Sequence, residues 1–146
     1  MINSSEGVLY ADISSLSNTV TSNYISISDG TYDNRISIFY SVGTNIIRAF
    51  LRVGGVSQVD LSVAVSDITA FHQVAFKFAQ DDFSLWIDGV EISTDVSGST
   101  IASNTLDRFH FGEVSGTTNP FKGNCKDLRV YKTALTDAEL QTLTTI

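Results

Sequence analysis

Apolar and polar side chains alternate along most of the chain. The alternation runs through Tyr24–Ser28, Arg35–Ser41, Ile47–Val53, Val59–Val65, Val74–Phe78, Leu85–Asp88 and Phe109–Phe111. A period of two predicts β-strands with one face in a core. We therefore expect each run to bury its apolar members, including the two phenylalanines that flank His110.

Turn-forming residues separate these runs. Gly54-Gly55 and Asp88-Gly89 each lie between two strand patterns, and both pairs suit the positive φ angles of tight hairpins. The segments Asp95–Asn104 and Glu113–Pro120 are rich in Ser, Thr, Gly and Asn, which predicts loops. Short strands at this regular spacing favour an all-β fold, an antiparallel β-sandwich.

One short helix is predicted at the C-terminus. The sequence Thr136-Asp-Ala-Glu139 is a capping box, and Leu135 and Leu140 are spaced as a hydrophobic staple around it. The apolar stripe continues to Leu143, so the helix should have about two turns.

Length and charge narrow the classes of protein. The chain has 146 residues, which suits one domain over residues 1–146. Its net charge of −7 argues against a nucleic-acid partner and against anionic membrane surfaces. No apolar run is long enough for membrane insertion, and the N-terminal residues do not have the pattern of a signal peptide. The single cysteine, Cys125, is expected to be a small buried hydrophobe on a central strand.

The polar sides of the predicted strands carry candidate ligand-binding residues. Sugars have apolar CH faces and many hydroxyls, so a site needs an aromatic ring beside charged hydrogen-bonding groups. The candidates, by strand, are Arg48, Phe50 and Arg52; Trp86 and Asp88; and His110. Two alternatives stay open, namely that Trp86 faces a core, and that Arg48, Phe50 and Arg52 form a subunit contact.

A calcium site is a further candidate. Asp29, Asp33 and Asn34 lie in one short acidic turn and offer the oxygen ligands that Ca²⁺ prefers. Asp and Asn are also common in turns because their side chains bond to the backbone. A purely structural role for these three residues is therefore an alternative to metal binding.

Three segments carry a resemblance to a known family. They are His72–Phe78, the hairpin Phe83-Ser-Leu-Trp-Ile-Asp-Gly89, and Lys126-Asp-Leu-Arg-Val-Tyr-Lys-Thr-Ala-Leu-Thr-Asp-Ala-Glu-Leu140. Together they resemble the laminin G-like branch of the concanavalin A-like lectin/glucanase jelly rolls. The resemblance implies two curved antiparallel sheets, with Asp127 and Arg129 of the ending motif as a structural pair hydrogen-bonded with neighbouring strands. Asn34–Tyr40, Ser97–Ser103 and Asp107–Gly112 further resemble domains from tail fibres and surface proteins of tailed bacteriophages.

Catalysis is not expected. Glycosidases of this fold place paired carboxylates on one strand in an E-x-D-x-E or E-x-D-x-x-E arrangement. None of the four glutamates, Glu6, Glu91, Glu113 and Glu139, fits that pattern, and no G-x-S-x-G nucleophile motif occurs. The resemblance therefore implies a non-enzymatic, lectin-like domain that binds a cell-surface glycan for host attachment. Its expected location is a virion or tail-fibre surface, or alternatively an extracellular or cell surface. The alternative function is a structural virion module, a capsid decoration or fibre building block, that contacts other virion proteins or further copies of itself.

Overall fold

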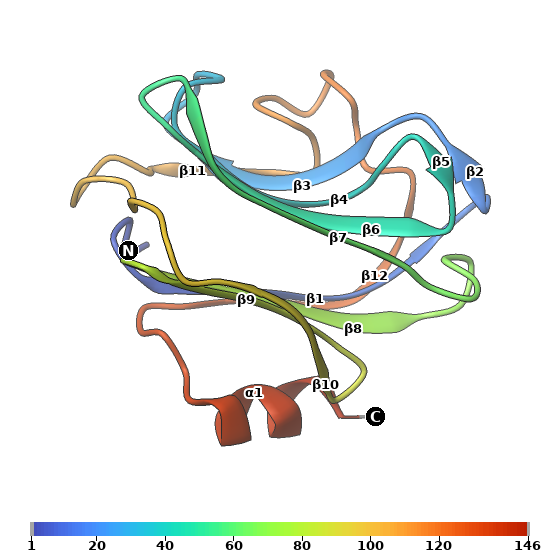
Figure 1. Cartoon of the computed structure of the whole chain (residues 1–146). Helices are drawn as coiled ribbons and strands as arrows, with labels where there is room; N and C mark the ends of the chain where they lie inside the picture. The colour runs from blue at the N-terminus through green and yellow to red at the C-terminus, as the bar shows by residue number, and fades with distance from the viewer. Residues whose placement is uncertain (1, 146) are drawn as a thin grey trace.

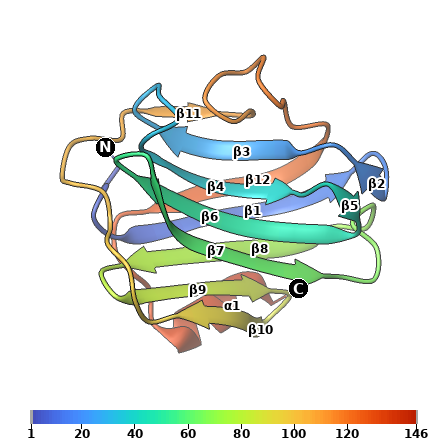
Figure 2. The ribbon, with the colours of Figure 1, turned by 45° about the horizontal axis from the view of Figure 1, so that its top comes forward.

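Two five-stranded antiparallel sheets lie face to face in the computed structural model, which describes residues 2–145 (Figure 1). The first sheet has the strand order β10-β9-β8-β1-β12, and we call it the helix-side sheet. The second has the order β11-β3-β4-β6-β7, and we call it the loop-side sheet. Figure 2 shows the strands of the loop-side sheet running side by side, with α1 beyond the other sheet.

The elements follow one another closely along the chain. Their bounds are β1 Gly7–Ser15, β2 Thr19–Val20, β3 Asn23–Ser28, β4 Arg35–Tyr40, β5 Gly43–Thr44, β6 Ile46–Val53, β7 Val56–Ala64, β8 His72–Ala79, β9 Asp82–Ile87, β10 Val90–Asp95, β11 Arg108–His110, β12 Gly123–Tyr131 and α1 Asp137–Thr144. The short strands β2 and β5 pair with each other at one end of the sandwich. The antiparallel sandwich with one C-terminal helix confirms the predicted fold class.

The core lies between the sheets and is built by the predicted alternation. In the loop-side sheet, Ile25, Ile38, Ala49 and Leu61 pair across four strands and are all buried. From the other sheet, Phe76 and Leu85 belong to the same buried cluster. Burial of such side chains stabilises the fold by roughly 1.5–3 kcal/mol each.

Both predicted tight hairpins are present. Gly54 and Gly55 have φ angles of 55° and 81° between β6 and β7. Asp88 and Gly89 have φ angles of 51° and 83° between β9 and β10. Two consecutive positive φ angles match the twist of the flanking strands, which explains the glycines and the aspartate there.

Helix α1 covers the outer face of the helix-side sheet. Thr136 caps it and accepts a hydrogen bond from the Glu139 amide, while the Glu139 carboxylate accepts one from the Thr136 amide at 2.8 Å. Leu140 is fully buried against Trp86, with Leu135 packed at the edge of the same cluster. The capping box and the apolar stripe are therefore confirmed. The part of the chain that the structure describes contains no helix with both the length and the apolar character of a membrane span.

Three details differ from the sequence predictions. Strand β12, which carries Cys125, is an edge strand and leaves the thiol exposed, so a buried position on a central strand was wrong. Phe111 lies beyond the end of β11 and is 44% exposed, so only Phe109 packs against the core. The central strand β1, whose Leu9, Ala11 and Ile13 alternate into the core, was not singled out from the sequence.

Candidate functional site

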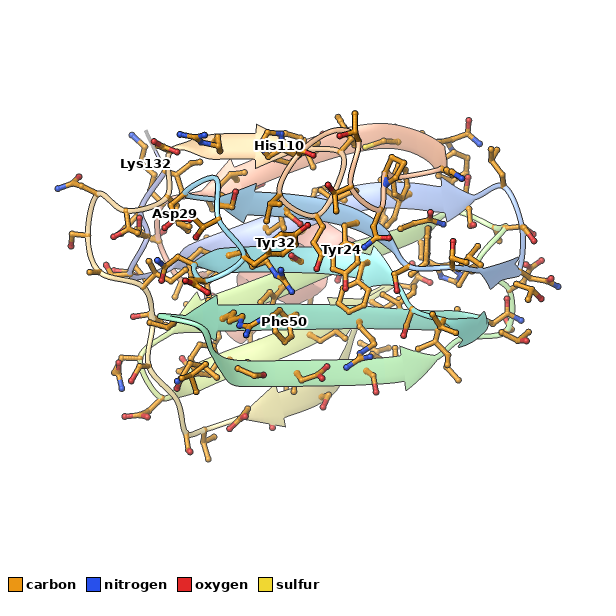
Figure 3. The ribbon with its side chains drawn as sticks, turned by 90° about the horizontal axis from the view of Figure 1, so that it is seen from above. Tyr24, Asp29, Tyr32, Phe50, His110 and Lys132 are labelled. Atoms are coloured by element: carbon orange, nitrogen blue, oxygen red, sulfur yellow. The ribbon has the colours of Figure 1, made fainter. Side chains whose placement is uncertain are left out.

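The outer face of the loop-side sheet gathers arginines, aromatic rings and small hydroxyls. The strand register aligns them in three rows across the sheet, His110–Ser26–Ser37–Phe50–Asp60, Arg108–Ser28–Arg35–Arg52, and Tyr24–Phe39–Arg48–Ser62. Figure 3 looks down on this face, with Tyr24, Tyr32 and Phe50 near its middle and His110 toward one edge. The rows follow directly from alternation, because the residues between them point into the core.

Two connecting segments cover the centre of this face. The segment between β3 and β4, residues 29–34, carries Tyr32, and the segment between β11 and β12, residues 111–122, carries Glu113. As a result every residue of β3 and β4 is buried, on both faces of the sheet. Ser26 and Ser37 lie at the centre, are fully buried, and share a hydrogen bond of 2.8 Å. The accessible part of the face is therefore the strip over β6 and β7 together with the Tyr32 segment.

Arg35 connects the covering segments to the sheet. Its Nη2 lies 3.0 Å from the Glu113 carboxylate, and the two side chains are only 7% and 11% exposed. Its guanidinium carbon lies 5.4 Å from the centre of the Tyr32 ring and 5.2 Å from that of Phe50. The Nε and Nη1 atoms of Arg35 are buried without a hydrogen-bond partner in residues 2–145. Such donors are costly to leave unsatisfied, which marks this point of the face as unusual.

A second aromatic and charged group lies beside the first. Tyr24 and Phe39 stack with ring centres 4.2 Å apart and planes within 9°. Arg48 lies over the Phe39 ring at 5.3 Å, and it forms a bidentate ion pair with Asp60. Burial, reinforced by the negative charge of Glu113, raises the pKa of Tyr24.

Arg52 and His110 have free nitrogen atoms on the same face. Arg52 is opposite Arg35 in the strand register, and it takes part in none of the ion pairs found within residues 2–145. The Nε of Arg52 and the Nε2 of His110 are buried without hydrogen-bond partners there. Arg108, at the end of the same row, is paired with its neighbour Asp107 at 2.8 Å.

The structure brings together four of the six predicted ligand-binding residues. Arg48, Phe50, Arg52 and His110 share this face. Trp86 does not, because it is 6% exposed on the helix-side sheet, packed beneath α1, with its Nε1 donating to Ser84 at 3.1 Å. Trp86 is therefore buried, as the core-packing alternative held, but it lies beneath α1 and not in the core between the sheets.

Asp88 has a structural position at the turn between β9 and β10. Its carboxylate lies 2.6 Å from Nδ1 of His72 and accepts a hydrogen bond from the Gln73 amide at 2.9 Å. Asp127 and Arg129 lie on edge strand β12 of the helix-side sheet and form an ion pair with each other at 2.7 Å, whereas hydrogen bonds to neighbouring strands were expected. Neither Asp88 nor this pair lies on the face described above.

Five residues of the face were not among the predicted site residues, namely Tyr24, Tyr32, Arg35, Phe39 and Glu113. Arg35 and Phe39 alternate with Ile36 and Ile38, so their outward direction was readable from the sequence. The contacts of Arg35 and Phe39 with residues of β6 depend on the β4–β6 register. The ion pair between Glu113 and Arg35 depends on the fold of the loop that carries Glu113. Neither follows from local pattern.

The acidic turn at residues 29–34 is tightly hydrogen-bonded. The Asp29 carboxylate accepts bonds from the Thr31 amide at 2.9 Å and from the Asn34 side chain at 2.8 Å. Although partial burial acts in the opposite direction, these bonds lower the pKa of Asp29. The turn is also tied to the β6–β7 hairpin, because Gly54 donates to the Asn34 side chain at 2.9 Å and Gly55 to the Asp33 carbonyl at 3.1 Å.

Calcium binding by Asp29, Asp33 and Asn34 stays a prediction. Across residues 2–145 the structure contains no cluster of three or more His, Cys, Asp or Glu side chains placed to hold a metal ion. Ca²⁺ also accepts oxygen ligands from Asn side chains and backbone carbonyls, and the turn at residues 29–34 offers both. Its Asp29 oxygens already accept hydrogen bonds that a metal would have to replace.

Comparison with known protein families identifies the superfamily of this chain. A family model described as the concanavalin A-like lectin/glucanases superfamily matches residues 11–141. The chain belongs to this superfamily. A search of the curated proteins found no match.

Several solved structures have a similar fold. A carbohydrate-binding module (CBM40) of the Ruminococcus gnavus IT-sialidase, bound to α2,3-sialyllactose, superposes with a TM-score of 0.78 at 20% identity, covering 97% of this chain and 83% of that one. Domain 4 of the Geobacillus stearothermophilus arabinanase AbnA, in complex with arabinotriose, gives 0.71 at 15% identity, covering 99% and 68%. A pentraxin of Limulus polyphemus gives 0.62 at 13%, covering 99% and 73%. At these identities the likeness is one of fold.

Proposed function

We propose that this domain is a non-catalytic carbohydrate-binding module, and that the outer face of its loop-side sheet is the binding surface. The observation that carries the proposal is the grouping of Tyr32 and Phe50 with Arg48 and Arg52 on the accessible part of that face. Tyr32 is 45% exposed, so its ring is available to a ligand. The two similar modules that hold sialyllactose and arabinotriose support a sugar as the class of ligand.

The expected mechanism combines stacking with charged hydrogen bonds. A sugar ring can lie against Tyr32 or Phe50 through its CH face, while its hydroxyls meet the Arg48–Asp60 pair. Affinity per site should be low, because the surface is an open strip over β6 and β7. Display in many copies turns such weak sites into firm attachment.

The absence of catalysis is part of the proposal. Three of the four glutamates have structural partners, since Glu6 binds the Ala134 amide, Glu113 binds Arg35, and Glu139 closes the capping box. A glycosidase of the usual kind needs two free carboxylates about 5–10 Å apart across the scissile bond. The similar structures that are carbohydrate-binding modules support a binding role.

For its biological setting we propose a virion or tail-fibre surface that attaches to host glycans. The support is the sequence resemblance of Asn34–Tyr40 and Asp107–Gly112 to phage surface domains. A tail fibre would also supply the many copies that a weak site requires. Staining of bacterial cells by the multivalent domain, lost after enzymatic removal of surface polysaccharide, tests this setting.

The binding experiment uses the domain coupled to a multivalent carrier on a broad glycan array. Phe50→Ala and Tyr32→Ala should each weaken the binding of any retained glycan by about tenfold or more, because a stacking contact contributes roughly 1–3 kcal/mol. Phe71→Ala is the matched control, since Phe71 is also partly exposed with a cation, Lys126, over its ring, but it lies outside the loop-side sheet. Binding that survives both face variants, or no binding of any glycan, would refute the proposal.

A structural virion module remains the alternative, because arginines and aromatic rings on one face are also typical of protein interfaces. In that case the domain would associate with itself or with a virion protein, and Phe50→Ala would weaken that association. Sedimentation of the wild-type domain and of Phe50→Ala separates the two functions. A monomer that binds glycans supports the module, and an oligomer that ignores glycans supports the alternative.

A further inference from the structure

The arginines of this chain are concentrated on one face. Four of its five arginines, at positions 35, 48, 52 and 108, project from the outer face of the loop-side sheet, although the net charge of the chain is −7. Arginine with an aromatic neighbour is suited to planar anions, because its fork of N–H donors matches a carboxylate. The ion-pair partners of the four arginines show which of their charges remain available to a ligand.

Two of these arginines are already neutralised within the domain. Arg48 is held by Asp60 in a bidentate pair, and Arg108 by the adjacent Asp107. These pairs leave little positive charge for a ligand. Arg48 and Arg108 are therefore explained by partners within the domain.

The other two arginines face each other across β4 and β6. Arg35 and Arg52 are directly opposite in the strand register, an arrangement in which like charges repel. Between them they have one carboxylate within ion-pair distance, that of Glu113 on Arg35, so one positive charge is left over. Asp33, an acid of the covering segment, lies beside Gly55 at the tip of the β6–β7 hairpin and forms no ion pair with either arginine.

Unused donors accompany the unbalanced charge. The Nε of Arg52, and the Nε and Nη1 of Arg35, are buried and unpartnered within residues 2–145. The Arg35 side chain is 93% buried, held between the Tyr32 and Phe50 rings. These three nitrogen atoms are enclosed, so an arriving acceptor would meet the partly exposed Arg52 side chain, and the surrounding buried groups would strengthen that contact.

We propose that the Arg35–Arg52 pair is a subsite for the carboxylate of an acidic sugar, so that the domain selects carboxylated over neutral glycans. This inference rests on the proposed function, whose stacking surface, Tyr32 and Phe50, adjoins the pair. A singly charged group matches the single uncompensated charge, and a carboxylate matches the planar fork of Arg52. The sugar ring lies on the aromatic surface while its acid group contacts Arg52, and the buried guanidinium of Arg35 adds positive charge beside it.

The test compares each acid with its own ester. The probes are 3′-sialyllactose and trigalacturonic acid, their methyl esters, and neutral lactose, titrated against the whole domain at two salt concentrations. The free acid of at least one pair should bind roughly ten- to hundredfold more tightly than its ester, since hydrogen bonds to a charged partner are the strong ones. That preference should decline as salt increases.

Substitutions assign the preference to the pair. Arg52→Gln keeps much of the side-chain stem, and it should reduce the affinity for the acid to that for the ester while leaving the ester unchanged. Arg52→Lys should recover part of the preference, because the charge returns without the fork. Arg129→Gln is the matched control, since Arg129 is an ion-paired arginine of the helix-side sheet, and it should bind like the wild type.

The outcomes distinguish failure of the carboxylate subsite from failure of the carbohydrate-binding function. Equal affinity for acids and esters, with binding still dependent on Phe50, would overturn the carboxylate subsite and keep the carbohydrate-binding proposal. A preference that Arg52→Gln leaves intact, or a preference for sulfated over carboxylated sugars on the glycan array, would also overturn it. If neither these probes nor any arrayed glycan binds, both proposals fail.

Discussion

Each sheet of this sandwich has a covered outer face, and the two covers are built from opposite chemistry. On the helix-side sheet, α1 places Leu140 over Trp86 and Ala75 and excludes water with apolar contact. On the loop-side sheet, two segments place Tyr32 and Glu113 around a buried arginine. The first arrangement leaves few donors to satisfy, whereas the second leaves several unsatisfied. Under the proposed function, the helical cover serves stability and the loop cover serves recognition.

Replacing the central aromatic of each face is the strongest test of this contrast. Trp86→Ala should lower the free energy of unfolding by about 3–5 kcal/mol, because it empties a site beneath α1. Phe50→Ala, on a half-buried surface, should cost about 1 kcal/mol. Urea denaturation measures both values. Equal losses of unfolding free energy would mean that the two aromatic residues stabilise the fold equally, which would contradict the contrast.

Breaking the buried ion pair is expected to be nearly as damaging. Glu113→Ala leaves Arg35 buried and uncompensated and should cost about 3 kcal/mol in unfolding free energy. The double variant Arg35→Met with Glu113→Leu should recover most of that loss, as apolar replacement of a buried pair often does. The same denaturation assay applies to both. A single variant as stable as the wild type would show that the pair does not hold the loop cover in place.

Loosening the helical cover should have a smaller effect. Thr136→Ala removes the side chain that accepts from the Glu139 amide and should cost about 1 kcal/mol. Glycan binding at the opposite face should be unaffected, because α1 and the loop-side sheet are on opposite sides of the sandwich (Figure 1). Thermal denaturation together with a binding titration checks this. A loss of binding would link the two faces.

The mildest perturbation is acid acting on the Tyr32 segment. Because hydrogen bonds lower the pKa of Asp29 in the folded state, its ionised form favours folding above the ordinary value of 3.8. That contribution is lost as the pH falls through the lowered value. The melting temperature of the wild type should therefore exceed that of Asp29→Asn at pH 7, and the difference should shrink toward pH 3. A constant difference would mean that the carboxylate charge is irrelevant to the turn.

The fold was predictable because alternation and turn residues are local signals. Ile36 and Ile38, or Leu85 and Ile87, needed only their neighbours in the sequence to be placed in the core. The burial of Trp86 was not predictable, because alternation directs it away from Leu85 and Ile87 but cannot tell an exposed face from one that a helix covers. Alternation within one strand was enough to predict that Arg48, Phe50 and Arg52 share a face. The positions of Arg35 and Glu113 beside them depend on contacts between segments far apart in the sequence.

The bonds that fasten the Tyr32 segment to the β6–β7 hairpin have a consequence for the rate of recognition. Gly54 and Gly55 bind Asn34 and Asp33, so the segment is ordered when the domain folds. The loss of loop entropy therefore belongs to folding, and a ligand meets a preorganised surface. A ligand of the proposed site would then associate in one step, at a rate set by diffusional encounter. Differences in affinity between ligands would appear mainly as differences in their dissociation rates.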